Sequence, residues 1–93
     1  MSTARSATTI DDDRLRITTW TFGAEGDNTG HHVHEYDYVV VPVSGGTFTI
    51  VDPDGGTREM AQEAGVPYLG TAGTAHDVVA AEPACFVEIE LKG

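Results

Sequence analysis

Short runs of alternating or β-branched residues follow one another along the chain, and glycine and proline separate them. Residues 14–22 alternate between apolar and polar side chains, and residues 47–51 place Phe48 and Ile50 on one face. Successive side chains of a strand point to opposite faces, so a period of two predicts strands. Further strands are predicted at residues 31–43, 57–61, 66–69, 76–80 and 85–91. No segment holds the 3.6-residue period of an amphipathic helix.

Turn residues separate these runs. The clearest example is the hairpin signal at residues 52–56, where proline presets φ and glycine accepts a positive φ. About eight short strands with such turns predict an all-β fold with little or no helix, a small antiparallel β-barrel or double-sheet jelly roll over residues 14–93. Residues 1–13 are polar and end in three aspartates, which predicts a flexible N-terminal arm. The arm could instead pair with a neighbouring subunit as an edge strand.

Composition narrows the possible partners. The 93 residues include 5 basic and 15 acidic side chains, a formal net charge of −10. This leaves no basic stripe for nucleic-acid phosphates, and it repels anionic membranes. Cys85 is the only cysteine, so no disulfide forms within the chain, and residues 1–10 lack the apolar core of a signal peptide. We therefore expect a cytoplasmic protein. A small core and exposed sheet edges favour a homodimer.

Three of the four histidines lie in the run His31-His32-Val33-His34. On a strand His32 and His34 point to the same face, with Cα atoms about 6–7 Å apart, so both imidazoles can reach one ion. His31 points the other way. Two imidazoles alone bind a metal weakly, and the remaining histidine, His76, starts a later predicted strand. The plainer interpretation of the pair is two ordinary surface or core histidines.

The residues around the first histidines resemble the first sequence motif of the cupin superfamily. That motif is usually G(x)5HxH(x)3-4E(x)6G, and Gly26, His32, His34 and Gly45 stand in its register. Tyr38 stands where the family usually has a glutamate.

The second cupin motif, usually G(x)5PxG(x)2H(x)3N, is matched in register by Gly65, Gly73 and His76. Thr71 replaces its proline and Ala80 its asparagine. The resemblance spans residues 26–80. It implies a cupin barrel in which His32, His34 and His76 bind one divalent transition metal, whether iron, manganese, nickel, zinc or copper.

Tyr38 changes the expected site, because a protonated phenol is a poor metal ligand. The site would then have three histidines and open positions for water or substrate. By strand parity Tyr38 faces inward, where it either orients substrate or donates a proton, or simply packs in the barrel. Glu35 and Asp37 have the opposite parity and would reach a metal only through a β-bulge. Otherwise both are solvated or lie at a subunit interface.

Open positions on a metal allow Lewis-acid or oxygen chemistry. We therefore expect a metal-dependent enzyme that acts on a small organic molecule. Some three-histidine cupins are non-haem iron dioxygenases, so the resemblance makes dioxygenase-like chemistry the most concrete version, with isomerase or lyase chemistry also compatible. Two alternatives remain. One is a non-catalytic small-molecule-binding or sensing cupin with a structural metal, and the other is a cupin that binds no metal.

Overall fold

A computed structural model describes residues 3–93. These residues form nine strands: β1 Arg5–Asp11, β2 Leu15–Phe22, β3 His32–Val33, β4 Asp37–Pro42, β5 Gly46–Val51, β6 Thr57–Gln62, β7 Tyr68–Gly70, β8 Ala75–Ala80 and β9 Ala84–Leu91. None of the described residues is helical, and so no helix there could cross a membrane. The prediction of an all-β fold with little or no helix is confirmed.

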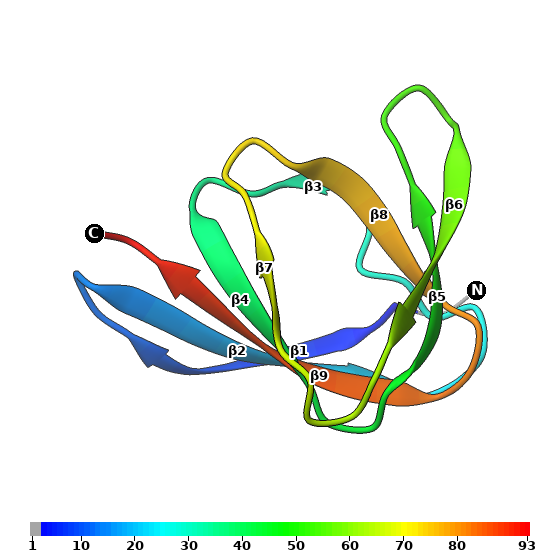
Figure 1. The fold of residues 1–93 in the computed structure, drawn as a ribbon, viewed down its shortest axis with the longest axis horizontal. Coiled ribbons are helices and arrows are strands. Elements are labelled where there is room, and N and C mark those ends of the chain that lie inside the picture. The colour runs from blue at the N-terminus through cyan, green and yellow to red at the C-terminus, as the bar shows by residue number, and fades with distance from the viewer. Residues whose placement is uncertain (1–2) are drawn as a thin grey trace.

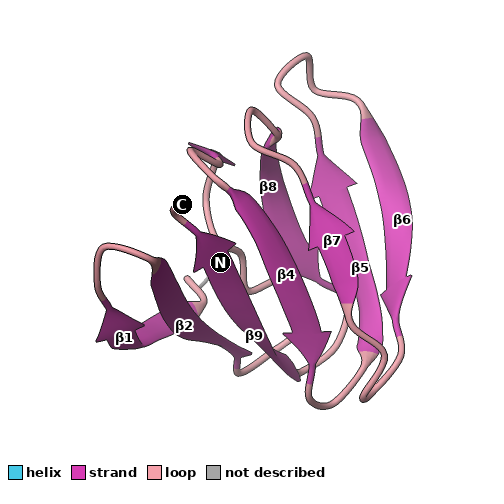
Figure 2. Cartoon of the chain, turned by 60° about the vertical axis from the view of Figure 1, so that its left-hand side comes forward, coloured by secondary structure: helices cyan, strands magenta, loops and turns pink. Residues whose placement is uncertain are grey.

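The strands form two sheets that face one another and enclose the core (Figure 1, Figure 2). One sheet has five strands in the order β1-β2-β9-β4-β7, and the other has four in the order β3-β8-β5-β6. All neighbouring strands pair antiparallel. This is the predicted double-sheet jelly roll.

Aromatic side chains from both sheets fill the space between them. Phe22 and Phe86 come from the five-stranded sheet and Phe48 from the four-stranded sheet, with ring centroids 5.2 to 5.9 Å apart. Phe48 is 0% exposed. Burying a side chain of this size stabilises a fold by about 1.5–3 kcal/mol, so these rings join the two sheets into one core.

The N-terminal segment is more ordered than its composition predicts. Ala4 is buried in the core, and strand β1 pairs with β2 over most of its length. The prediction of a flexible arm over residues 1–13 is therefore wrong for residues 3–11, while residues 1 and 2 lie outside the described residues. The pairing is within the chain, which removes the need for exchange onto a neighbouring subunit. The barrel domain predicted from residue 14 includes β1.

The single strand predicted at residues 31–43 is two strands in different sheets. His32–Val33 form β3 in the four-stranded sheet, and Asp37–Pro42 form β4 in the five-stranded sheet. The chain crosses between the sheets at residues 34–36. Local alternation cannot detect such a crossing, because each half keeps its own strand pattern.

Candidate metal centre

Two short segments bring the histidines of distant sequence positions together. His32 on β3 is the direct cross-strand partner of His76 on β8. His34 follows β3, and its backbone is fixed on both sides: its N–H donates to the Thr74 carbonyl and its carbonyl accepts from the Gly73 N–H, each at 2.8 Å. The loop before β8 therefore holds His34 beside the rings of His32 and His76.

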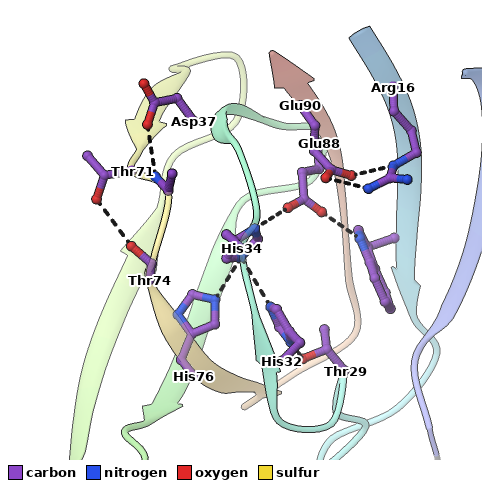
Figure 3. Close-up of polar contacts among 12 residues, drawn as sticks. Arg16, Thr29, His32, His34, Asp37, Thr71, Thr74, His76, Glu88 and Glu90 are labelled. Atoms are coloured by element: carbon purple, nitrogen blue, oxygen red, sulfur yellow. Dashed lines mark hydrogen bonds and ion pairs between the residues drawn. The ribbon is translucent and has the colours of Figure 1, made fainter. Parts of the chain in front are cut away.

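The Nε2 atoms of the three rings converge (Figure 3). The distance from His34 Nε2 to His32 Nε2 is 3.2 Å, and the distance to His76 Nε2 is also 3.2 Å. Two nitrogens at that separation, each about 2.0–2.1 Å from one ion, subtend roughly 100° at it, which suits both tetrahedral and octahedral sites. The three predicted histidines thus have the spacing that a shared metal needs.

Contacts at Nδ1 indicate which nitrogen of His32 and of His34 is available to a metal. The Nδ1 of His32 lies 2.8 Å from the Gly30 carbonyl, which can only accept, so this nitrogen carries the proton. The Nδ1 of His34 lies 3.2 Å from Glu88 Oε1. The hydrogen bond holds His32 in the tautomer that leaves Nε2 unprotonated and able to bind a cation, and a carboxylate beside Nδ1 favours the same tautomer of His34.

Burial favours the neutral form of the rings as well. Burial is the main cause that lowers the pKa of His34 to about 4, and neighbouring His32 and His76 add to it. Burial likewise lowers the pKa of His76 to about 4, followed by the effect of His32. Neutral imidazole is the form that binds metals, so these residues fit a bound transition metal near pH 7.

Glu88 is the residue that the sequence reasoning missed. It lies on β9, is 8% exposed, and holds His34 through one oxygen while its other oxygen accepts from the Trp20 indole N–H at 3.0 Å. Burial raises the pKa of this carboxyl. Strand parity could have found it, since Glu88 is two residues from the inward Phe86. Its contact with Nδ1 makes it a support for His34 and not a further member of the Nε2 cluster.

Tyr38 comes from the opposite sheet and stacks on His34. The two ring centroids are 3.8 Å apart with an 18° angle between the planes, and the tyrosine is 6% exposed. Burial raises the pKa of its phenol, so the group is protonated at neutral pH. Tyr38 faces inward as predicted, although it does so from another sheet.

The remaining predicted candidates are not members of the convergent cluster found in residues 3–93, although Glu35 lines the same cavity. His31, Glu35 and Asp37 are exposed. Asp37 instead accepts a hydrogen bond from the Ala72 N–H at 2.8 Å, which holds the loop before β8. Neither carboxylate belongs to the group of ligand atoms that converge among residues 3–93.

A cavity of about 590 Å³ opens beside the three histidines. Its wall is largely apolar and aromatic, with Trp20, Met60, Tyr68 and Phe86 among the lining residues. Apolar walls with a few convergent polar groups are typical of sites for small organic molecules.

Two facing antiparallel sheets and three convergent inward histidines agree with the cupin class that the sequence motifs resemble. A cupin domain from Bordetella pertussis Tohama I has the same fold, with a TM-score of 0.90 and 35% sequence identity over 99% of this chain and 96% of that one. A cupin superfamily protein from Desulfitobacterium hafniense DCB-2 shares the fold at a TM-score of 0.75 and 17% identity, over 97% of this chain and 78% of that one.

A protein with a related sequence identifies the family of this chain more closely. The β-alanine degradation protein BauB of Pseudomonas aeruginosa is 40% identical over 85 residues, which cover 89% of this chain and 87% of BauB. The chain therefore belongs to the same family as BauB, and its likeness to the Bordetella domain makes it a cupin. No family model matches the sequence.

Proposed function

We propose that this cupin is a metal-dependent enzyme acting on a small organic molecule held in the cavity beside the histidines. The observation that supports it is the convergence of three histidine Nε2 atoms at the cavity wall, in a group that contains no fourth histidine, cysteine or carboxylate from residues 3–93. A site closed by four protein ligands is typical of a structural metal, whereas three leave room for substrate. A bound iron, manganese, nickel, zinc or copper ion would supply Lewis-acid or oxygen chemistry there.

The roles of the chain's own residues follow from their positions. His32, His34 and His76 would hold the metal, and Glu88 keeps His34 in the required tautomer. Tyr38 would orient the substrate or donate a proton to it, because its buried phenol keeps its proton at neutral pH. Dioxygenase chemistry is the most concrete version of the proposal, and an isomerase or lyase would use the same residues.

The relative BauB is named for β-alanine degradation. We place the substrate of this protein in the same chemical range, a small carbon skeleton that fits a 590 Å³ cavity. We also propose a cytoplasmic location, where the thiol of Cys85 would stay reduced.

Metal analysis of untagged protein tests the proposal. We expect about one equivalent of bound metal and a higher melting temperature on adding zinc or nickel, because an ion that binds only the folded state stabilises it. His76→Ala should abolish both effects. His31→Ala is the matched control, since this exposed histidine lies in the same run and should leave binding unchanged.

Activity is the second readout. Iron-loaded protein is assayed for oxygen consumption with three-carbon acids, and the metal-loaded forms are assayed for isomerase and lyase products. Metal far below one equivalent, with no change in melting temperature, would overturn the metal site. Stoichiometric metal without turnover of any such acid would favour the non-catalytic binding cupin.

A further inference from the structure

Two cationic side chains line the cavity, and their surroundings differ. Arg16 is neutralised by Glu90, since its Nε and Nη2 donate to the two carboxylate oxygens at 2.8 and 2.7 Å. Within residues 3–93, Arg58 has one ion-pair contact, Nη2 to Asp52 Oδ1 at 3.4 Å, between side chains that are 60% and 37% exposed. A guanidinium has five N–H donors, so Arg58 keeps most of its donors for another partner.

Arg58 lies on the inner face of the four-stranded sheet. It pairs across β5–β6 with Ile50, which is 1% exposed, and Ile50 pairs across β5–β8 with Val78. Val78 is two residues from His76, so Arg58 and His76 share this face. Strands β6 and β8 are two strand spacings apart, about 10 Å, which a small molecule can bridge. After burial and His32, the charge of Arg58 also lowers the pKa of His76, consistent with their proximity.

We propose that the cavity takes a small carboxylate, with the carboxylate bound by Arg58 and the rest of the molecule directed toward the three histidines. The inference rests on the proposed function and adds its substrate class. Arginine binds carboxylates through paired, charge-assisted hydrogen bonds. The net charge is −10, so most of the surface repels anions. Arg58, whose charge is incompletely neutralised, is a place inside the cavity that attracts an anion instead.

Malonate binding to the zinc-loaded protein tests this inference by calorimetry, with uncharged malonamide as the matched ligand. We expect Arg58→Gln to weaken malonate binding about tenfold or more, the usual effect of losing a charged hydrogen bond. Arg14→Gln removes the same charge from an exposed position outside the cavity. Because salt screens exposed charges, this variant should change the malonate affinity less than about twofold.

Three outcomes would overturn the carboxylate inference: equal malonate affinity of the two arginine variants, equal binding of malonamide, or no binding of malonate at millimolar concentration. Zinc stoichiometry is measured in the same samples. Loss of zinc binding indicates failure of the metal site, whereas intact zinc binding with unchanged malonate affinity rejects the role of Arg58 alone.

The outer face of the five-stranded sheet supports a second, independent inference. Ile10, Ile17, Ile89, Val39 and Leu69 are successive cross-strand partners, and so one aliphatic row runs across all five strands. The next row contains Ala7, Thr19, Val87 and Val41. Neither row contains a charged residue, although charged side chains make up 22% of the chain.

The outer face of the whole five-stranded sheet, which carries the apolar outer face defined by these two rows, reaches the size that a second copy of the chain needs. Its strands are three to eight residues long and hold 32 residues, so at about 4.8 Å between strands and about 3.3 Å per residue they cover roughly 500 Å². Two such faces would bury about 1,000 Å², about the smallest area expected of a biological interface. Leu69 is 77% exposed and Ile10 47% exposed in the isolated chain. Identical copies carry a strong net negative charge, so they associate most easily where both surfaces are uncharged.

We infer that two copies of this chain pack through the apolar outer face to form a homodimer. Light scattering after size-exclusion chromatography at micromolar concentration should give twice the chain mass. Ile89→Lys and the milder Leu69→Lys each place a charge in the row and should give monomers that keep the β-sheet circular dichroism spectrum. Val33→Lys changes an aliphatic residue that is 69% exposed on the other sheet, and this variant should stay dimeric. A monomeric wild type, or folded dimers of both row variants, would overturn the inference.

Discussion

Replacing Gly70 by alanine should distort the stack of Tyr38 on His34, one ring of the histidine cluster. Gly70 is the cross-strand partner of Tyr38, and a Cβ at this position would lie 2.0 Å from Cζ of the tyrosine ring and 2.3 and 2.4 Å from its two Cε atoms. Carbon atoms in contact are normally about 3.5–4.0 Å apart, so the ring must move by roughly 1.5 Å. His34 restricts that movement, since it stacks on the ring at 3.8 Å.

The expected cost combines two effects. Overpacking a well-packed site costs about 1–3 kcal/mol, and disturbing an aromatic stack costs about 0.5–1.5 kcal/mol. We expect Gly70→Ala to lower the free energy of unfolding by about 2–3 kcal/mol. For a domain of this size that corresponds to a melting temperature lower by roughly 10–20 °C.

Urea denaturation of the metal-free protein, followed by circular dichroism, measures this cost. Gly23→Ala is the control, because its Cβ would meet Asp27 Oδ2 at an ordinary 3.6 Å, and we expect a change below about 0.5 kcal/mol. A double-mutant cycle isolates the contact. In a Tyr38→Val background the ring is absent, so the added methyl group should cost little. A Gly70→Ala variant as stable as the wild type, or an undiminished cost in the Tyr38→Val background, would refute the reasoning.

Three further outcomes are expected. Glu88→Gln removes the carboxylate that holds His34 Nδ1 and should weaken zinc binding about 10–100-fold in calorimetry, whereas unchanged affinity would reject its supporting role. The pKa of His76 falls from 6.5 to about 4 on folding, so the unfolded chain binds the extra proton and the metal-free protein loses stability as the pH falls from 6.5 toward 4. In urea titrations at pH 7 and 5, His76→Gln should reduce that loss, and an equal loss would contradict it. Arg16→Met leaves Glu90 without its bidentate partner and should lower the free energy of unfolding by about 1–2 kcal/mol. The double variant Arg16→Met/Glu90→Gln should recover part of this loss. Equal stability of the wild type and the single variant would show that the ion pair contributes nothing.

The features that the sequence predicted correctly are those with a local physical cause. Alternation predicted strands because one face of each is buried between the sheets. The motif glycines also reflect local geometry: Gly45 has a φ of 72° and Gly73 a φ of 90°, a region that other residues rarely adopt. A Cβ at Gly45 would also lie 3.0 Å from the Ala64 nitrogen, so this turn excludes a side chain.

The features that it missed depend on contacts between distant segments. All residues of β1 are exposed, so this strand has no buried face and no apolar alternation to reveal it. Its position depends on pairing with β2, and only the three-dimensional structure shows that pairing. The crossing between β3 and β4 was missed for a similar reason, because the partners of each strand come from far along the chain.

Tyr38 shows how such distant contacts change the interpretation of a motif. The sequence marks it as a departure from the glutamate of related cupins, and by itself this leaves the role of the position open. In the structure the ring lies between His34 and Gly70, and the space it occupies exists because Gly70 has no side chain. The carboxylate that contacts His34 comes instead from Glu88 on β9, and it contacts Nδ1, the nitrogen that faces away from the cluster. Aromatic packing on His34 therefore occupies the position where the motif usually has a glutamate, and the three Nε2 atoms converge beside the cavity.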